Sequence, residues 1–227
     1  MHRLLFRILQ VFTVCFLTYG FVLISVQTPA AAADSEVPHP ALLELQEAVS
    51  KLFPNHKLEI RHLGENKSYV LIDELADIGP VRIELKLSEK PNAFAIPAYR
   101  SKSGAAQIIL TTALKNLLIN KSELAFVIAH ELAHLREDHF SPDLPAITLT
   151  SSQLEKIVRV HQGWEMTADK EAVEMLYRRG LDARAGLHLL GRLDQFEAKD
   201  KLAAERSHPA ISERLNRLNS QIAQILP

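Results

Sequence analysis

The segment VIAHELAHLREDH, residues 127–139, holds two histidines four positions apart, with a glutamate directly after the first. On an α-helix, positions i and i+4 share a face, so His130 and His134 can reach one metal ion. Glu131 lies beside them and can take a proton from an attacking water. The pattern is typical of a zinc-dependent hydrolase. The alternative is a buried helix whose two histidines are simply hydrogen-bonded.

The residues around this motif favour the metal site because nearly all of them are apolar. The run LAFVIA at 124–129, together with Leu132 and Ala133, would bury the helix on most sides. Buried His and Glu side chains are costly unless they are paired or bind a metal. His139 follows His134 by five positions, about 140° further round an ideal helix. We therefore expect His139 to be a surface residue at the helix end and not a ligand of the same metal.

A catalytic zinc site needs a third protein ligand and one open position. The longer motif H-E-x-x-H-x-x-G-x-x-H is excluded, because Glu137 and Phe140 stand where it has Gly and His. The third ligand is then expected to be a glutamate from a later helix. The candidates are Glu155, Glu165, Glu171 and Glu174.

Glu165 is the best of these candidates because of its neighbours along a helix. Two alanines on the same helix face would allow close packing against the motif helix; that face comprises Ala168, Asp169, Ala172 and Leu176. Asp169 lies one turn after Glu165 and can accept a hydrogen bond from the outer N–H of a ligand histidine. The alternative for Glu165 is an ordinary solvent-exposed glutamate.

The chain before the motif is mostly extended. The segment VRIELKL at 81–87 alternates apolar and charged residues, which predicts a half-buried strand. Further strands are predicted in KLEIRHL, SYVLI, NAFAIP and AQIILTT, with YRSKSG as the turn between the last two. An amphipathic helix is predicted at 41–53, where one face carries Leu42, Leu45, Val49 and Leu52.

From Thr112 onward the pattern is helical. We predict a short helix at 114–118, the motif helix at 122–138 with Ser122 as its N-cap, and Gly180 as the C-cap of a helix at 164–179. The other helices are expected at about 151–161, 182–198 and 208–225. This order predicts an α+β fold that is predominantly α-helical and compact, with a small antiparallel or mixed sheet.

The N-terminus has the pattern of an export signal. Arg3 and Arg7 precede an uncharged, mostly apolar run at 8–26, and Ala31 and Ala33 fit a cleavage site. Alternatively, the run stays attached as a membrane anchor, for which it is just long enough.

We therefore expect a signal peptide or N-terminal anchor at 1–33 and one functional domain at 34–227. The protein would be exported, to the periplasm or another extracytoplasmic space, and would associate with the membrane through residues 8–26 if these are not removed.

Composition excludes two other classes. The formal net charge of −1 gives no sign of nucleic acid as a partner. Cys15 is the single cysteine, which excludes an internal disulfide framework and a cysteine-ligated zinc site.

Four segments, in order, resemble the HtpX/BepA-type zinc metallopeptidases, a family that includes the CAAX prenyl proteases and Oma-type enzymes. The segments are NAFAIP, SELAFVIAHELAHLREDH, EMTADKEAVEMLYRRGLD and SHPAISERLNRL. They span about residues 92–218 and correspond to the family's strand before the active site, metal helix, third-ligand helix and C-terminal His-Pro segment. Ala98 and Tyr99 stand where the family often has paired glycines, so the rim of the substrate site would differ.

The resemblance implies a role for individual residues. His130, His134 and Glu165 would be the zinc ligands, Glu131 the general base, and Asp169 the support of a ligand histidine. An extended substrate would add as a further strand to the segment Asn92, Ala93, Phe94, Ala95, Ile96 and Pro97. His208 and Arg214 would approach the site, where they could stabilise the oxyanion, or His208 could cap the zinc in a resting state. Their alternatives are a helix-start residue and a surface ion pair.

These features predict a zincin-type metalloendopeptidase with one Zn²⁺ per chain that hydrolyses polypeptides outside the cytoplasm. By resemblance alone, misfolded or mislocalised envelope proteins would be its substrates, in a quality-control role. One alternative is a zinc-bearing binding or chaperone-like module with low or autoinhibited proteolytic activity. Another is a metal-free helical scaffold anchored by residues 8–26.

Overall fold

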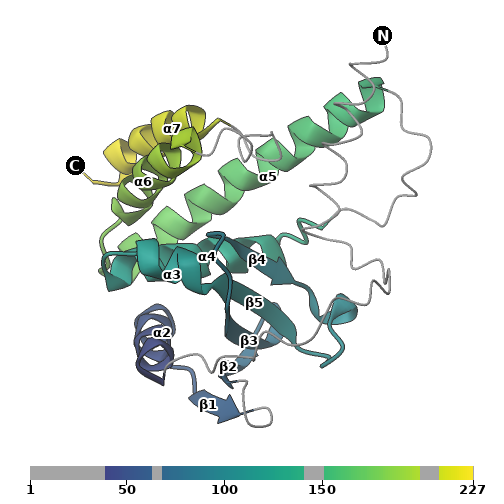
Figure 1. Cartoon of the computed structure of the whole chain (residues 1–227), viewed down its shortest axis with the longest axis vertical. Helices are drawn as coiled ribbons and strands as arrows, with labels where there is room; N and C mark the ends of the chain where they lie inside the picture. The colour runs from purple at the N-terminus through teal and green to yellow at the C-terminus, as the bar shows by residue number, and fades with distance from the viewer. Residues whose placement is uncertain (1–38, 63–67, 141–150, 200–209, 227) are drawn as a thin grey trace.

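A five-stranded mixed sheet lies on one side of the molecule and the long helices lie on the other (Figure 1). The computed structural model describes residues 39–62, 68–140, 151–199 and 210–226. The predicted export signal, Cys15 and His208 lie outside these residues. None of the helices in the described ranges is long and apolar enough to cross a membrane.

The strand order in the sheet is β1-β2-β3-β5-β4. The strands are β1 (Leu58–His62), β2 (Ser68–Leu75), β3 (Gly79–Lys86), β4 (Ala93–Ile96) and β5 (Ala106–Thr111). Neighbouring strands are antiparallel except β3 and β5, which are parallel. This confirms the predicted α+β class, and the sheet is of the mixed kind.

Alternation in β3 follows the sequence pattern until the strand ends. Val81, Ile83 and Leu85 are buried, as a half-buried strand requires. Leu87, the fourth apolar residue of the pattern, is 60% exposed because β3 ends at Lys86 and the pleat no longer turns it inward. The short 3₁₀-helix η1 (Ala98–Arg100) follows β4.

The helices are α2 (His39–Leu52), α3 (Thr112–Leu117), α4 (Lys121–Arg136), α5 (Ser151–Arg178), α6 (Ala185–Lys199) and α7 (Ile211–Ile225). Helix α2 packs on β1 and β2, and α4 packs on β4 and β5. Helices α5 and α6 cover the other side of α4, and α7 packs on both of them (Figure 1). Helix α4 is therefore the centre of the molecule.

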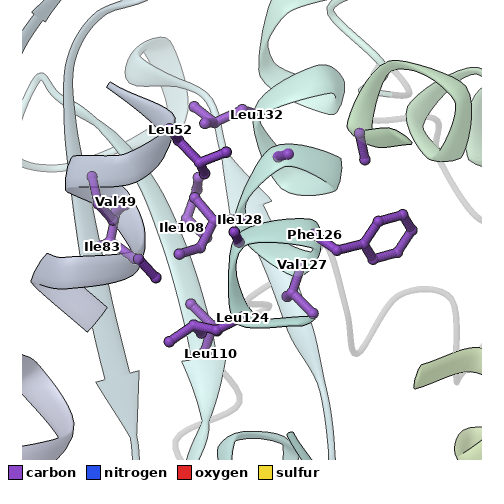
Figure 2. Close-up of a cluster of buried hydrophobic side chains, with 14 of the residues drawn as sticks. Val49, Leu52, Ile83, Ile108, Leu110, Leu124, Phe126, Val127, Ile128 and Leu132 are labelled. Atoms are coloured by element: carbon purple, nitrogen blue, oxygen red, sulfur yellow. The ribbon is translucent and has the colours of Figure 1, made fainter. Parts of the chain in front are cut away.

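The main hydrophobic core joins α2, the sheet and α4, as Figure 2 shows. Leu52 of α2, Ile83 and Ile108 of the sheet and Ile128 and Leu132 of α4 are each at most 1% exposed. At about 25 cal/mol per Å² of apolar surface removed from water, each fully buried side chain of this size contributes about 1.5–3 kcal/mol. This core holds one side of α4 against the sheet.

Two predicted helix boundaries are wrong. The helices expected at 151–161 and 164–179 are one helix, α5, because Gly163 continues it. A glycine costs a helix only about 1 kcal/mol, which is too little by itself to break a helix of 28 residues. The N-cap of α4 is Asn120 and not Ser122: the Asn120 side chain accepts a hydrogen bond of 3.0 Å from the backbone N–H of Glu123.

The predicted C-cap at Gly180 is confirmed. Gly180 has a φ of 66°, its N–H donates to the carbonyl of Tyr177, and the N–H of Leu181 donates to the carbonyl of Leu176, each at 3.0 Å. This is the Schellman pattern, which requires a residue that tolerates the left-handed region. Helix α5 therefore ends where the sequence predicts.

Candidate metal centre

Helix α4 is buried on nearly every side, and a buried ion pair secures its first turn. Every residue from Glu123 to Leu135 is buried. The Glu123 carboxylate, 1% exposed, accepts a hydrogen bond of 2.8 Å from the N–H of Ile119 and pairs with Arg192 of α6. A carboxylate in the first helical turn also suits the positive end of the helix dipole. These contacts place the H-E-x-x-H motif in a dry, well-packed setting.

The C-terminal end of α4 changes the position of His139. The helix ends at Arg136, Asp138 takes a left-handed φ of 49°, and the N–H of His139 donates to the carbonyl of His134 at 3.0 Å. This turn folds His139 back over the helix end, so its ring lies 5.3 Å from that of His134. Its expected surface position is wrong, because His139 is only 8% exposed. The helical-wheel argument fails since residue 139 is no longer helical.

The side chains of three residues converge where α5 packs on α4. His130 Nε2 and His134 Nε2 are 3.1 Å apart, as their shared helix face predicts. Glu165 of α5 brings its carboxylate between them, with 3.3 Å from Oε1 to His134 Nε2 and 3.5 Å from Oε2 to His130 Nε2. All three residues are buried, and they form the one group in the described part of the chain arranged to hold a metal ion.

The spacing of these atoms fits a tetrahedral zinc ion. Ligand atoms at about 2.0–2.1 Å from a tetrahedral zinc lie about 3.3 Å from one another. The two histidine nitrogens are 3.1 Å apart, and each has one of the two Glu165 oxygens at 3.3 or 3.5 Å, so the separations are close to that value. Two neutral imidazole nitrogens and a carboxylate are also a ligand set that zinc takes in catalytic sites.

The other glutamates considered as third ligands lie elsewhere. The side chain of Glu155 is 72% exposed and pairs with Arg159. Glu174 pairs with Arg178 and Lys170 on the surface of α5. Burial and the nearby charge of Glu137 raise the pKa of Glu171, which is away from the histidines. Glu165 reaches the histidines because it lies on the face of α5 that packs against α4.

Asp169 and Arg214 contact the proposed ligands His130 and Glu165. Asp169 Oδ1 is 3.0 Å from His130 Nδ1, the position expected from its spacing after Glu165. Arg214 of α7 donates two hydrogen bonds to Asp169, at 2.8 Å from Nε and 2.7 Å from an η nitrogen, and its other η nitrogen is 3.4 Å from Glu165 Oε2. The guanidinium therefore binds two carboxylates at once, and the oxyanion role stays a prediction.

The electrostatics of the cluster favour a divalent cation. Three buried carboxylates, from Glu131, Glu165 and Asp169, surround the largely buried guanidinium of Arg214. Burial lowers the pKa of His130, but Asp169 and Glu165 outweigh it and raise that pKa to about 10. The excess of negative charge thus stabilises a positive charge at the histidines, and a bound metal ion would supply one.

The charges also hold Asp169 ionised. Burial alone would raise the pKa of Asp169, but Arg214 and His130 outweigh it and lower that pKa. Asp169 and Glu165 in turn raise the pKa of Arg214 despite its burial. Burial and the neighbouring His134 lower the pKa of His139 to about 4.

The segment expected to bind substrate is at one end of the sheet. Strand β4 pairs with β5 on one side, with Ala93 opposite Leu110 and Ile96 opposite Gln107. No strand among the described residues pairs with its other edge. Strand β4 also packs on α4, which places this edge next to the helix that carries the motif. The outer edge of β4 is therefore unpaired among the described strands, and substrate binding along it stays a prediction.

Sequence reasoning missed an aromatic row beside His134. Trp164 stacks on His139, with ring centroids 5.3 Å apart and 14° between the planes, and it also stacks on His161, with centroids 4.8 Å apart and 22° between the planes. In the sequence, Trp164 directly precedes Glu165, and His161 lies one helical turn before Glu165. This spacing could have placed both rings near the site.

Comparison with known proteins identifies one family. Residues 74–162 match the sequence model of Peptidase family M48. The matched segment includes the H-E-x-x-H motif and ends before Glu165. No curated protein is significantly similar to the chain. The match, together with the cluster of His130, His134 and Glu165, supports a metallopeptidase of this family, whose members are zinc-dependent hydrolases.

Proposed function

We propose that the chain is a zinc metalloendopeptidase that hydrolyses internal peptide bonds of polypeptides. The observation that carries the proposal is the meeting of His130 Nε2, His134 Nε2 and the Glu165 carboxylate at distances of 3.1–3.5 Å, on the helix that also carries the buried Glu131. The match of residues 74–162, which include this motif, to Peptidase family M48 supports the same reaction class.

Each residue has a part in the hydrolysis. Bound Zn²⁺ supplies a Lewis acid for the scissile carbonyl and the attacking water. Glu131 takes the proton from the water as its oxygen bonds to the carbonyl carbon. When the C–N bond breaks, Glu131 passes that proton to the leaving amine. Asp169, held by Arg214, orients His130 so that its Nε2 faces the ion.

Strand β4 is the proposed substrate strand. An extended polypeptide that paired with its outer edge would gain main-chain hydrogen bonds that carry no sequence preference. Side chains would then supply selectivity, since alternate residues of β4 face opposite sides of the sheet. This binding mode suits unfolded polypeptides, because a folded domain exposes few unpaired strands.

Two finer points rest on the sequence. The four segments similar to the HtpX/BepA type support that subtype, and the pattern of residues 1–33 supports export to an extracytoplasmic space. An exported peptidase that holds extended polypeptides through main-chain hydrogen bonds suits the removal of misfolded envelope proteins.

The test is Glu131→Gln in the purified full chain. This change keeps the size of the side chain and removes the base. Zinc content should therefore stay at one per chain, while cleavage of casein should fall by about 10²–10⁴-fold, the usual effect of a lost general base. Glu155→Gln is the matched control, because Glu155 is an exposed residue of α5 and the change should leave cleavage unaltered. Unchanged cleavage by Glu131→Gln would refute the proposed function.

A further inference from the structure

The outer nitrogens of the two proposed ligand histidines face different kinds of partner. His130 Nδ1 is 3.0 Å from a carboxylate oxygen of Asp169. His134 Nδ1 is 3.2 Å from the Nδ1 of another histidine, His139. Ligand histidines usually donate this N–H to a carboxylate, a backbone carbonyl or water, so an imidazole in this place is a departure.

Metal binding decides which of the two histidines donates. The inference rests on the proposed function, in which His134 binds zinc through Nε2. A neutral imidazole whose Nε2 lone pair binds a metal carries its proton on Nδ1. His134 Nδ1–H must then donate, and His139 Nδ1 must accept with its own proton on Nε2. The 3.2 Å separation suits such an N–H···N hydrogen bond.

His139 is held in this place from several sides. The left-handed turn at Asp138 and the bond from the His139 N–H to the His134 carbonyl fix its backbone. The ring lies nearly parallel to that of Trp164, at 14°. The hydroxyl of Tyr99 donates to Asp138 at 3.2 Å and ties the turn to the segment after β4. The ring therefore has little freedom to turn its Nδ1 away from His134.

We propose that His139 is a positioning residue that orients His134 toward the metal by accepting its Nδ1–H, and that Trp164 holds the His139 ring in place. The two histidine ligands are thus supported unequally. Asp169 offers a charged acceptor to His130, whereas His139 offers an uncharged one to His134, and a charged acceptor makes a ligand imidazole more basic. His139 thereby fixes the direction of His134 while it adds no negative charge beside the metal.

Two substitutions separate orientation from packing. His139→Phe keeps a flat ring against Trp164 and removes the acceptor. His139→Asn offers a side-chain oxygen at the position of the lost Nδ1 and removes the stacked ring. His188→Phe on the exposed face of α6 is the control for a lost histidine.

The readout is zinc affinity, measured by competition with a chelator on the purified full chain. Loss of a support for a ligand typically weakens metal binding 10–100-fold. We expect His139→Phe to weaken it about 10-fold or more, His139→Asn to stay within about 3-fold of the parent chain, and His188→Phe to match the parent. Parent-level affinity in His139→Phe, or equal losses in both His139 variants, would overturn the proposal.

A second measurement needs no substitution and therefore does not depend on the folding of a variant. In ¹⁵N-histidine-labelled protein with zinc, the Nδ1 nuclei of His134 and His139 should be coupled across the hydrogen bond, with the proton on His134. Absence of this coupling, or a proton on the His139 nitrogen, would overturn the proposal. Tight zinc binding without casein cleavage would refute the peptidase activity and leave the role of His139 standing.

Discussion

Removing Arg214 should destabilise the protein strongly, because it leaves two buried carboxylates without their cation. The Arg214 side chain is 11% exposed, and Asp169 and Glu165 beside it are 3% and 10% exposed. Breaking a buried ion pair by deleting one partner costs about 3–5 kcal/mol. The positive charge of His130 next to Asp169 offsets part of this loss, so we expect about 3 kcal/mol for Arg214→Met.

The assays are chemical denaturation and thermal unfolding of Arg214→Met and the parent protein, both in the presence of a chelator. A loss of about 3 kcal/mol corresponds to a fall in Tm of about 6–12 °C in a protein of this size. Arg217→Met is the matched control. Arg217 lies one turn further along α7, its side chain is 61% exposed, and its pair with Glu213 is worth less than about 1 kcal/mol.

The effect should also depend on pH in one direction. Arg214 and His130 lower the pKa of Asp169 despite burial, so the ionised carboxylate stabilises the folded state above its ordinary pKa of 3.8. That contribution is lost as the pH falls below 3.8 and through the lowered folded value. The cost of Arg214→Met should therefore be full at pH 7 and shrink in acid.

A double-mutant cycle supplies the decisive result. Asp169→Asn keeps an acceptor for His130 but removes the charge that Arg214 balances. Arg214→Met should therefore cost much less in the Asp169→Asn background than in the parent. A loss below about 1 kcal/mol in the parent, or equal losses in both backgrounds, would refute the account of Arg214 as the buried counter-charge.

Two other predictions concern the ligand glutamate and the packing of α6. Glu165→Gln should lower zinc affinity by at least about 10-fold without unfolding the chain, measured by chelator competition, whereas Glu174→Gln should not; equal affinities would exclude Glu165 as the ligand. Gly186→Ala should cost about 1–3 kcal/mol in urea denaturation, because a Cβ there would lie 2.5 Å from the buried ring of Phe126. Gly191→Ala, where a Cβ meets nothing within 4 Å, should be neutral or stabilising, and a neutral Gly186→Ala would show that the ring moves freely.

The sequence predicted helices and strands well where each of them is specified by residues that are close together in the chain. Each of the five strands and the helices α2, α4 and α6 is close to its expected range, because alternation and helical spacing reflect burial on one face. Boundaries were less predictable. Ser122 and Asn120 are both good N-caps, and only the structure shows that Asn120 holds the N–H of Glu123. The gap expected between residues 161 and 164 is absent, because α5 continues through Gly163.

The sequence by itself determined that His130 and His134 face one point, because four residues make about one helical turn and this geometry is local. It also determined that Asp169 follows Glu165 on the same face. The sequence favoured Glu165 over Glu155, Glu171 and Glu174 through its neighbours on the helix, but only the tertiary structure brings its carboxylate to the histidines, because that depends on how α5 packs on α4. The tertiary structure also decided that Arg214, 45 residues away in the chain, balances Asp169.

His139 shows the same division within one short segment. Its spacing from His134 predicted a residue on another side of an ideal helix, and that prediction assumed that the helix continues. A single left-handed residue, Asp138, ends the helix and turns the ring of His139 back toward His134. Local spacing therefore determines which side chains share a helix face. What supports those side chains depends on the turn at the end of α4 and on Trp164, which belongs to another helix.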